Sequence, residues 1–394
     1  MKREPILDPA VRAASIALCG MVALANAMGI GRFAFTPLLP MMQDDAGLSV
    51  AAGGWLASAN YLGYLLGALS AMRLTLAAAT AIRIGLFAIG AATLLMGLTD
   101  SFIAWIALRM IAGIASAWVL IFVSAWCLEW LAPLRRPLLS AAVFSGVGLG
   151  IALAGFVCLI LMRLGVRSSD AWLLMGALSV VLTAVVWRTF SPRRAPAVRK
   201  SHEERSPFQW TRTSLRMVLC YGAFGFGYII PATFLPAMAK QIVQDPRVFG
   251  WSWPIFGLAA FFSTVATAAI QKSVSNRALW IASELVMAAG VILPVLWPGI
   301  AAIILASLLV GGTLVVVTMV GIQEAREVGN SQASQLIAAM TAAFATGQIL
   351  GPILVSALAH VNHGFAIALS LACLLLSASA AALYRPSVPS LDNS

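Results

Sequence analysis

Charged residues are scarce in this sequence. They make up 10% of its 394 positions, while hydrophobic residues make up 61%. Soluble domains usually carry about 25% charged residues, so this composition excludes a soluble globule. A mean hydropathy of +0.94 instead predicts an all-α membrane protein that crosses the bilayer many times.

Histidine and cysteine are also too sparse to build most kinds of reactive site. The 3 histidines form no HExxH pattern. The 5 cysteines lie singly inside apolar runs, which favours neither disulfides nor a metal site. We therefore expect no metal, no cofactor and no catalytic residues, and these absences argue against an enzyme.

Long apolar runs are what the sequence has instead. A helix needs about 20 apolar residues to cross roughly 30 Å of hydrocarbon, and twelve runs reach that length. We expect transmembrane helices at 13–42, 51–76, 80–98, 102–131, 138–162, 171–190, 215–239, 251–271, 279–297, 299–323, 333–359 and 365–384.

Basic residues lie mostly in loops on the side of the two termini, which predicts cytoplasmic termini. We assign the net charge of +11 to this topology signal and expect no nucleic-acid partner. One long polar stretch, 191–212, separates an N-terminal six-helix bundle (1–190) from a C-terminal one (213–394). This linker is expected to be a cytoplasmic tether, with binding of anionic lipid headgroups as the alternative.

The two bundles carry diverged copies of one pattern. Seven residues of the first half recur, with the same residue types, 196 positions later in the second half. They are Gly29, Gly31, Leu39, Pro40, Met42, Gly54 and Trp55, which correspond to Gly225, Gly227, Leu235, Pro236, Met238, Gly250 and Trp251. The copies differ in chemistry at one position, because Arg32 corresponds to Tyr228. A duplication of this kind argues against an ion channel.

This layout resembles the major facilitator superfamily (MFS) of secondary transporters. The segments RMIAG at 109–113, SGVGLG at 145–150 and GQILGP at 347–352 are similar to its motifs, although GALSAMR at 67–73 lacks the acid usual in that loop. The segments GIGRFAFTPLLP at 29–40, GWLASANYLGYLLGAL at 54–69 and RMIAGIASAWVLIF at 109–122 resemble the YbfB/YjiJ-like bacterial branch. The resemblance implies a monomeric transporter of the bacterial inner membrane, working by alternating access through a central cavity between two pseudo-symmetric bundles.

Two arginines inside apolar runs are the main candidates for substrate binding. Arg32 and Arg109 both fall in the expected outer half of the membrane, where an arginine is costly unless it faces a partner or a wet cavity. The resemblance places their helices around the cavity. Two guanidiniums there favour an organic anion. The alternative is that each caps backbone carbonyls or extends to the headgroups.

Other polar side chains lie deep in the expected spans. Those assigned to the substrate site are Asn60, Tyr61, Tyr64, Tyr228 and Gln348, with Tyr221 and Thr233 nearby in sequence. A buried tyrosine hydroxyl needs a partner, which a substrate or a neighbouring helix can provide. Glu284 is the one acid clearly within a span, so a proton-carrying carboxylate in the cavity is not evident.

Two acids at the expected cytoplasmic ends of the fourth and tenth helices suggest an inner gate. Glu129 and Glu324 are expected to pair with nearby cations when these ends close, and the candidate cations are Arg73, Arg135, Arg136, Lys272, Arg277 and Arg326. The alternative is that both acids are ordinary interfacial charges.

Two functions remain open within transport: movement of a small organic anion, which is favoured, and export of drugs or toxic compounds. The expected partners are a small-molecule substrate and the lipid bilayer. A coupling proton, the direction of transport and the substrate are left open.

Overall fold

The structure is a computed structural model, and it describes residues 9–71, 73–74, 76–131, 137–190, 210–270, 273–329 and 332–384. Within these residues all regular structure is helical. The elements of the first half are α1 (Pro9–Leu24), η1 (Ala25–Phe33), α2 (Phe35–Asp45), α3 (Val50–Ala71), α4 (Ala78–Met96), α5 (Phe102–Leu131), α6 (Pro137–Arg163) and α7 (Ser168–Val186). Those of the second half are α8 (Arg212–Ile242), α9 (Pro246–Phe249), α10 (Ser252–Ile270), α11 (Asn276–Leu296), α12 (Ile300–Gly329), α13 (Ala333–Ala357) and α14 (Gly364–Tyr384).

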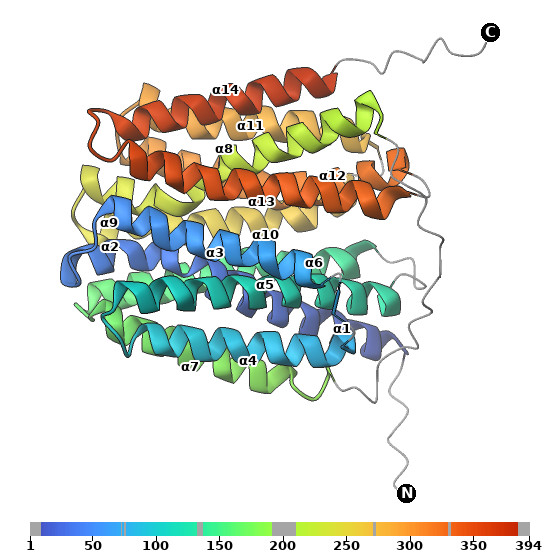
Figure 1. Cartoon of the computed structure of the whole chain (residues 1–394), viewed down its shortest axis with the longest axis horizontal. Coiled ribbons are helices and arrows are strands. Elements are labelled where there is room, and N and C mark those ends of the chain that lie inside the picture. The colour runs from blue at the N-terminus through green and yellow to red at the C-terminus, as the bar shows by residue number, and fades with distance from the viewer. Residues whose placement is uncertain are drawn as a thin grey trace, which may run out of the picture.

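The long helices run side by side in one bundle (Figure 1). Helices of the first half, coloured blue to green, and helices of the second half, coloured yellow-green to red, occupy opposite sides of it. The start of α1 and the end of α14 lie at the same end of the bundle. We call this the terminal end and the other the far end.

Eleven helical segments of the described residues are long and apolar enough to cross a membrane. They account for every expected span except the second, which is α3. This helix has the length, 22 residues, but is less apolar because it contains Asn60, Tyr61 and Tyr64. A helix that carries polar groups at this depth must bury them against its neighbours, and all three are buried.

The sequence predicts one continuous helix for the first span, but the structure shows three consecutive segments there. It consists of α1, the π-helix η1 and α2 in direct succession, and all nine residues of η1 are buried. A π-turn widens the helix and moves its carbonyls away from the usual α-helical partners. Polar side chains from α3 and α5 take up several of these carbonyls, as described below, and such distant partners leave no local signal in the sequence.

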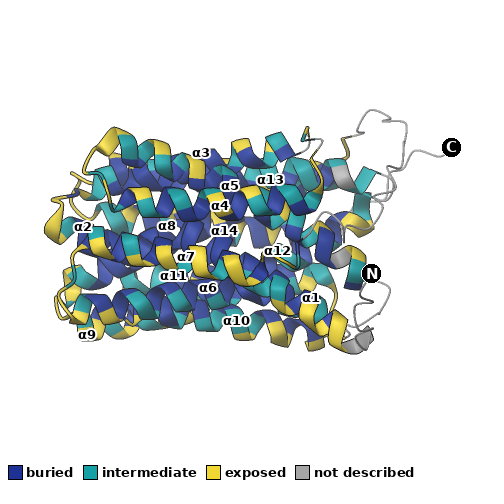
Figure 2. Cartoon of the chain, turned by 90° about the horizontal axis from the view of Figure 1, so that it is seen from below, coloured by how far each residue is buried: buried dark blue, intermediate teal, exposed yellow. Residues whose placement is uncertain are grey.

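The most extensive contacts between the halves are those of α3 with α13 and of α6 with α10. At the first contact, Ser58 Oγ donates to Ile349 O (3.2 Å) and Ser356 Oγ donates to Ala51 O (3.1 Å). At the second, the backbones approach so closely that a Cβ added at Gly148 would lie 2.3 Å from the backbone nitrogen of Phe261. Exposed residues, coloured yellow in Figure 2, lie on the outside of the bundle, and large hydrophobic residues such as Ile103 (81% exposed) are among the exposed ones.

The linker expected at 191–212 lies outside the described residues up to position 209. Its last residues form the start of α8. Thr211 is the N-cap, since its Oγ accepts from Ser214 N (3.0 Å) while Ser214 Oγ accepts from Thr211 N (2.9 Å). Reciprocal bonds of this kind satisfy two backbone donors at a helix start, which fixes where the second half begins.

Candidate functional site

The π-helix η1 is anchored by side chains of two neighbouring helices. Ser116 Oγ on α5 donates to Ala27 O (2.9 Å), and Asn60 Nδ2 on α3 donates to Gly31 O (3.3 Å). Arg109 Nη2 on α5 donates to Arg32 O (3.0 Å). Buried backbone carbonyls require such partners, so α3 and α5 hold η1 in its widened form.

Arg32 sits at the end of η1 in an aromatic box that consists of Phe33, Tyr61 and Tyr64. Its Cζ lies 5.2 Å, 5.1 Å and 4.1 Å from the three ring centroids, respectively. The side chain is buried, and neither Nε nor Nη2 has a hydrogen-bond partner. Ring faces attract a cation by about 2 kcal/mol or more when water is excluded, but they accept no conventional hydrogen bond from these two nitrogens.

Arg109 is buried beside this box. Its Cζ lies 4.8 Å from the ring centroid of Phe35. One nitrogen, Nη2, caps Arg32 O, while Nε has no partner. The sequence left open that Arg109 caps a backbone carbonyl. Its Nη2 does so, while its Nε does not. Asn60 Nδ2 in turn donates to Arg109 O (2.9 Å), so Asn60 links the two arginine-bearing segments.

No carboxylate pairs with either guanidinium within the described ranges, where the ion pairs join Lys240 to Asp44 and Arg277 to Glu324. An ionised group without a counter-charge in a dry interior costs several kcal/mol. Arg32 Nε, Arg32 Nη2 and Arg109 Nε are thus buried cationic donors that have neither a hydrogen-bond partner nor a paired carboxylate.

Side chains of the second half reach the same region. Tyr61 Oη and Thr233 Oγ1, on α3 and α8, are 2.9 Å apart and share a hydrogen bond. Tyr228 on the same helix α8 accepts a hydrogen bond from the Gln348 amide on α13. All the expected site residues are thus buried in one region where the halves meet: Arg32, Asn60, Tyr61, Tyr64, Arg109, Tyr228 and Gln348.

Sequence reasoning missed the aromatic rings that complete this region. Phe33 stands next to Arg32, and Phe344 on α13 stacks on Tyr228 with centroids 5.6 Å apart and planes at 8°. A phenylalanine in an apolar span gives no signal of a binding role, because most such residues simply pack. The ring contacts of Phe33 and Phe344 could be found only from the three-dimensional structure.

The expected inner-gate residues lie at the terminal end of the bundle. Arg277 and Glu324 form an ion pair between α11 and α12, with Nη2 and Oε1 2.9 Å apart. Both belong to the second half, so this pair does not cross between the halves. Glu129 and Arg73 are exposed. Three further candidate cations, Arg135, Arg136 and Lys272, lie outside the described residues.

The far end of the bundle carries contacts between the halves that the sequence did not predict. Lys240, on α8, pairs with Asp44 on α2, and its Nζ also donates to Pro40 O (2.9 Å). One turn or two deeper, Thr36 Oγ1 donates to Ala232 O (2.8 Å). Both contacts join positions 196 apart in sequence, so equivalent points of the repeat meet here. These contacts tie α2 to α8 at the far end.

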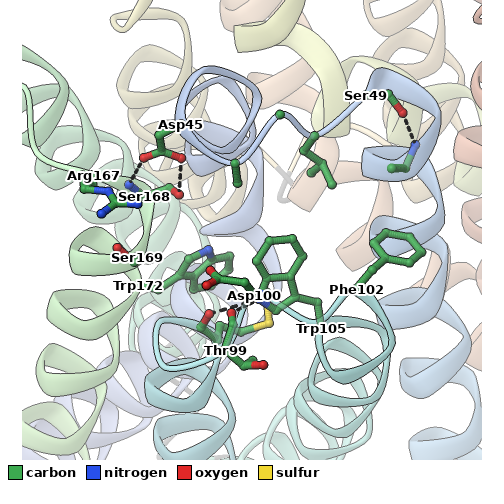
Figure 3. Close-up of a pocket in the computed structure, with 15 residues that line it drawn as sticks. Asp45, Ser49, Thr99, Asp100, Phe102, Trp105, Arg167, Ser168, Ser169 and Trp172 are labelled. Atoms are coloured by element: carbon green, nitrogen blue, oxygen red, sulfur yellow. Dashed lines mark hydrogen bonds between the residues drawn. The ribbon is translucent and has the colours of Figure 1, made fainter.

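A pocket of about 540 Å³ opens at the far end among the loops of the first half (Figure 3). Asp45, Asp100 and Arg167 are among its lining residues. Asp45 Oδ1 accepts from Ser168 Oγ (2.6 Å), and its other oxygen accepts from Ser168 N at the start of α7. The Asp45 carboxylate thus serves as a helix cap. None of the expected substrate-site residues lines this pocket.

No group of three or more His, Cys, Asp or Glu side chains that could hold a metal ion occurs in the part of the chain that the structure describes. Glu284, the acid within a span, is buried on α11, and its Oε1 accepts from Trp280 Nε1 (2.9 Å). The site is therefore cationic and aromatic in character.

Comparison with known proteins agrees with this helical architecture. Residues 24–384 match the family described as "Uncharacterised MFS-type transporter YbfB". The chain is also similar to the "Uncharacterized MFS-type transporter YceJ" of Bacillus subtilis (strain 168), with 28% identity over 223 residues. That match covers 53% of this chain and 54% of the relative, so it spans about half the length of each. The family expected from the sequence motifs is confirmed.

Proposed function

This chain belongs to the family of MFS-type transporters described by YbfB, and we propose that it is a secondary active transporter of a small organic anion. It is a multi-pass membrane protein and a transporter, not an enzyme. In the proposal, two six-helix bundles, 1–190 and 213–394, move about a central site and expose it alternately to the two sides of the membrane. The linker 191–212 connects them.

The observation that carries the proposal is the unpaired, buried edge of Arg32. Nε and Nη2 of a guanidinium point their N–H groups in parallel along one edge, and this spacing matches the two oxygens of a carboxylate. Both nitrogens lack partners in Arg32. A carboxylate bound there would make two charge-assisted hydrogen bonds and would supply the missing counter-charge.

Arg109 supports the site in a different way. Its Nη2 holds the carbonyl of Arg32, so its first effect is on the backbone that carries the substrate-binding guanidinium. Its positive charge adds to the potential at the same depth. The proposal therefore makes Arg32 the binding residue and Arg109 a positioning residue.

Export of cationic drugs is the competing function. A cationic substrate would be repelled by two buried guanidiniums, and it would need a carboxylate for compensation. The buried acids among the described residues are Glu284 and Glu324, which are bonded to Trp280 and Arg277, respectively. This distribution of charge favours the anion.

We further propose that the protein resides in the bacterial inner membrane as a monomer with cytoplasmic termini. The concentration of basic residues on the terminal side supports this orientation. The far end, with the Asp44–Lys240 pair, then faces outward. A cytosol-requiring reporter fused after Arg199 should give signal and one fused after Asp100 should not, and the opposite pattern would reverse the orientation.

A thermal-shift screen of the purified full chain tests the proposed function directly. The panel contains small carboxylates, neutral sugars and cationic drugs at equal concentrations. We expect carboxylates to raise the unfolding temperature, because a ligand that binds the folded state stabilises it, and the best of them to show counterflow in proteoliposomes. Stabilisation by cationic drugs alone would replace the anion transporter with the exporter.

A further inference from the structure

A cluster of aromatic rings in the second half of the chain lies on the helices that meet the Arg32 region. The second half contributes Tyr228 and Phe344, stacked at 5.6 Å, and Phe224, whose centroid lies 5.2 Å from each of the other two. Tyr228 shares α8 with Thr233. Thr233 Oγ1 lies 2.9 Å from Tyr61 Oη, and the Tyr61 ring in turn lies 5.1 Å from Arg32 Cζ. The three rings pack on one another with interplanar angles of 8°, 29° and 35°, and we call them the aromatic wall (Phe224, Tyr228 and Phe344).

Ordinary core packing does not account for what lies beside these rings. A hydrophobic core excludes unpaired polar atoms, since each costs free energy when buried. Here two such groups border the aromatic wall. One is the Nε and Nη2 edge of Arg32, and the other is Oε1 of Gln348, which is fully buried and has no partner.

The two unpaired groups have complementary chemistry. The Arg32 edge donates hydrogen bonds and carries positive charge, so it fits a carboxylate. The Gln348 amide uses its nitrogen to donate to Tyr228 Oη, which leaves Oε1 free to accept from a hydroxyl or amino group. Between them, the aromatic wall offers flat faces that favour an offset-stacked ring over an aliphatic chain.

We propose that the substrate is an aromatic carboxylate whose ring carries a hydrogen-bond donor, such as a hydroxyl or amino group. Its carboxylate binds the free edge of Arg32, its ring stacks on the aromatic wall, and its donor group bonds to Gln348 Oε1. This inference rests on the proposed function, because it assigns the class of anion that the same site takes.

Binding measurements on the purified full chain test this assignment with matched probes. The probes are benzoate, cyclohexanecarboxylate, 3- and 4-hydroxybenzoate, the corresponding methoxybenzoates, and benzamide as the neutral analogue. We expect benzoate to bind about three- to tenfold more tightly than cyclohexanecarboxylate, as ring stacking is worth about 0.5–1.5 kcal/mol. At least one hydroxybenzoate should bind more tightly than both benzoate and its methoxy counterpart, and benzamide should bind at least tenfold more weakly than benzoate.

Variants assign each preference to its side chain. Phe344→Leu should remove the preference for benzoate over cyclohexanecarboxylate, and Gln348→Met should remove the preference for the hydroxyl group while keeping carboxylate binding. Phe234→Leu is the matched control, because Phe234 is a buried phenylalanine on α8, the helix of Phe224 and Tyr228, but packs on Phe365 of α14. It should leave all the preferences intact.

The outcomes separate this inference from the proposed function. Equal binding of benzoate and cyclohexanecarboxylate would overturn the aromatic assignment while the anion site stood. Equal binding of hydroxy and methoxy compounds, or a hydroxyl preference that survives in Gln348→Met, would overturn the role of Gln348. Failure of every carboxylate in the panel and in the wider screen would remove the proposed function itself.

Discussion

Arg109 Nη2 donates a hydrogen bond of 3.0 Å to the backbone carbonyl of Arg32. One buried arginine thus fixes the main chain from which the other projects, at a point where η1 passes into α2. The two residues are 77 positions apart in sequence. We propose that the Arg32 guanidinium binds the substrate, while the Arg109 guanidinium holds the backbone. The variants below separate these parts.

Replacement of Arg32 tests the binding part. Arg32→Gln should weaken carboxylate binding more than tenfold, since a charge-assisted bidentate contact is lost. Arg32→Lys should restore it only in part, because an ammonium group lacks the paired donors of the guanidinium edge. The ligand-free Arg32→Gln protein should unfold at a temperature equal to or above that of the parent, as a buried charge without a counter-ion is removed.

Titration calorimetry and thermal unfolding measure these effects. Arg83→Gln is the control, because Arg83 is partly exposed on α4 and bonds to Trp187 O, far in sequence from the site. Normal binding and transport by Arg32→Gln would show that Arg32 is a structural residue.

Replacement of Arg109 tests the positioning part. Arg109→Leu leaves Arg32 O without its donor, and loss of a charged hydrogen-bond partner to a buried group costs about 1.5–3 kcal/mol. We expect a lower unfolding temperature together with weaker carboxylate binding. Arg109→Lys can still donate to the carbonyl and should recover most of the stability. If Arg109→Leu weakens binding with no loss of stability, Arg109 contacts the substrate itself.

The two arginines also show what could be predicted from sequence. A guanidinium inside an apolar run is costly enough to mark Arg32 and Arg109 as candidates, and the helical rise predicts their similar depth. The π-helix η1, which contains Arg32, could not be predicted, because its carbonyls are held by Ser116, Asn60 and Arg109, which lie 89, 29 and 77 positions from the carbonyls they bind. The eleven apolar segments of the described residues follow from hydropathy, which depends on local composition. The aromatic wall depends on which ring faces which, and local composition does not encode that.

The ion pair between Asp44 and Lys240 is expected to stabilise the state that is closed at the far end of the bundle. These residues tie α2 to α8 at the far end, and alternating access requires this tie to break. Asp44 is largely exposed, so the pair itself contributes no more than about 1 kcal/mol. Asp44→Asn should therefore raise the population open at the far end by up to about fivefold.

A membrane-impermeant maleimide can measure this opening by its rate of reaction with a cysteine in place of Thr36. Thr36 lies buried between the same two helices. The background lacks the two partly exposed cysteines, Cys19 and Cys373. Asp44→Lys combined with Lys240→Asp should return the labelling rate toward that of the parent. Asp170→Asn, which removes an exposed acid from the first turn of α7, should leave the rate unchanged, and an equal increase in that variant would show a general charge effect.

Glu129 and Glu324 are expected to stabilise the state that is closed at the terminal end of the bundle. Glu324 pairs with Arg277 within the second half while the far end is tied, and Glu129 is exposed. When the terminal ends of the two halves come together, both acids would approach cations of the other half in a less hydrated setting, where ion pairs are stronger than at a free surface. A conformational bias equals the difference in interaction energy between two states. Combined Glu129→Gln and Glu324→Gln should therefore shift the protein toward the state open at the terminal end by about 1–2 kcal/mol, or roughly five- to thirtyfold.

A cysteine at Thr318 on α12, which lies partly buried in the half of that helix nearer the terminal end, reports this shift through its labelling rate in inside-out vesicles. The rate should rise in the double variant and rise less in either single variant. Glu327→Gln is the matched control: Glu327 also lies at the end of α12, but it is exposed and accepts a hydrogen bond from Asn276 of the same half. Unchanged labelling in a folded and inserted double variant would make Glu129 and Glu324 interfacial charges with no part in gating, because removal of their charge would then have altered the free energies of both states equally.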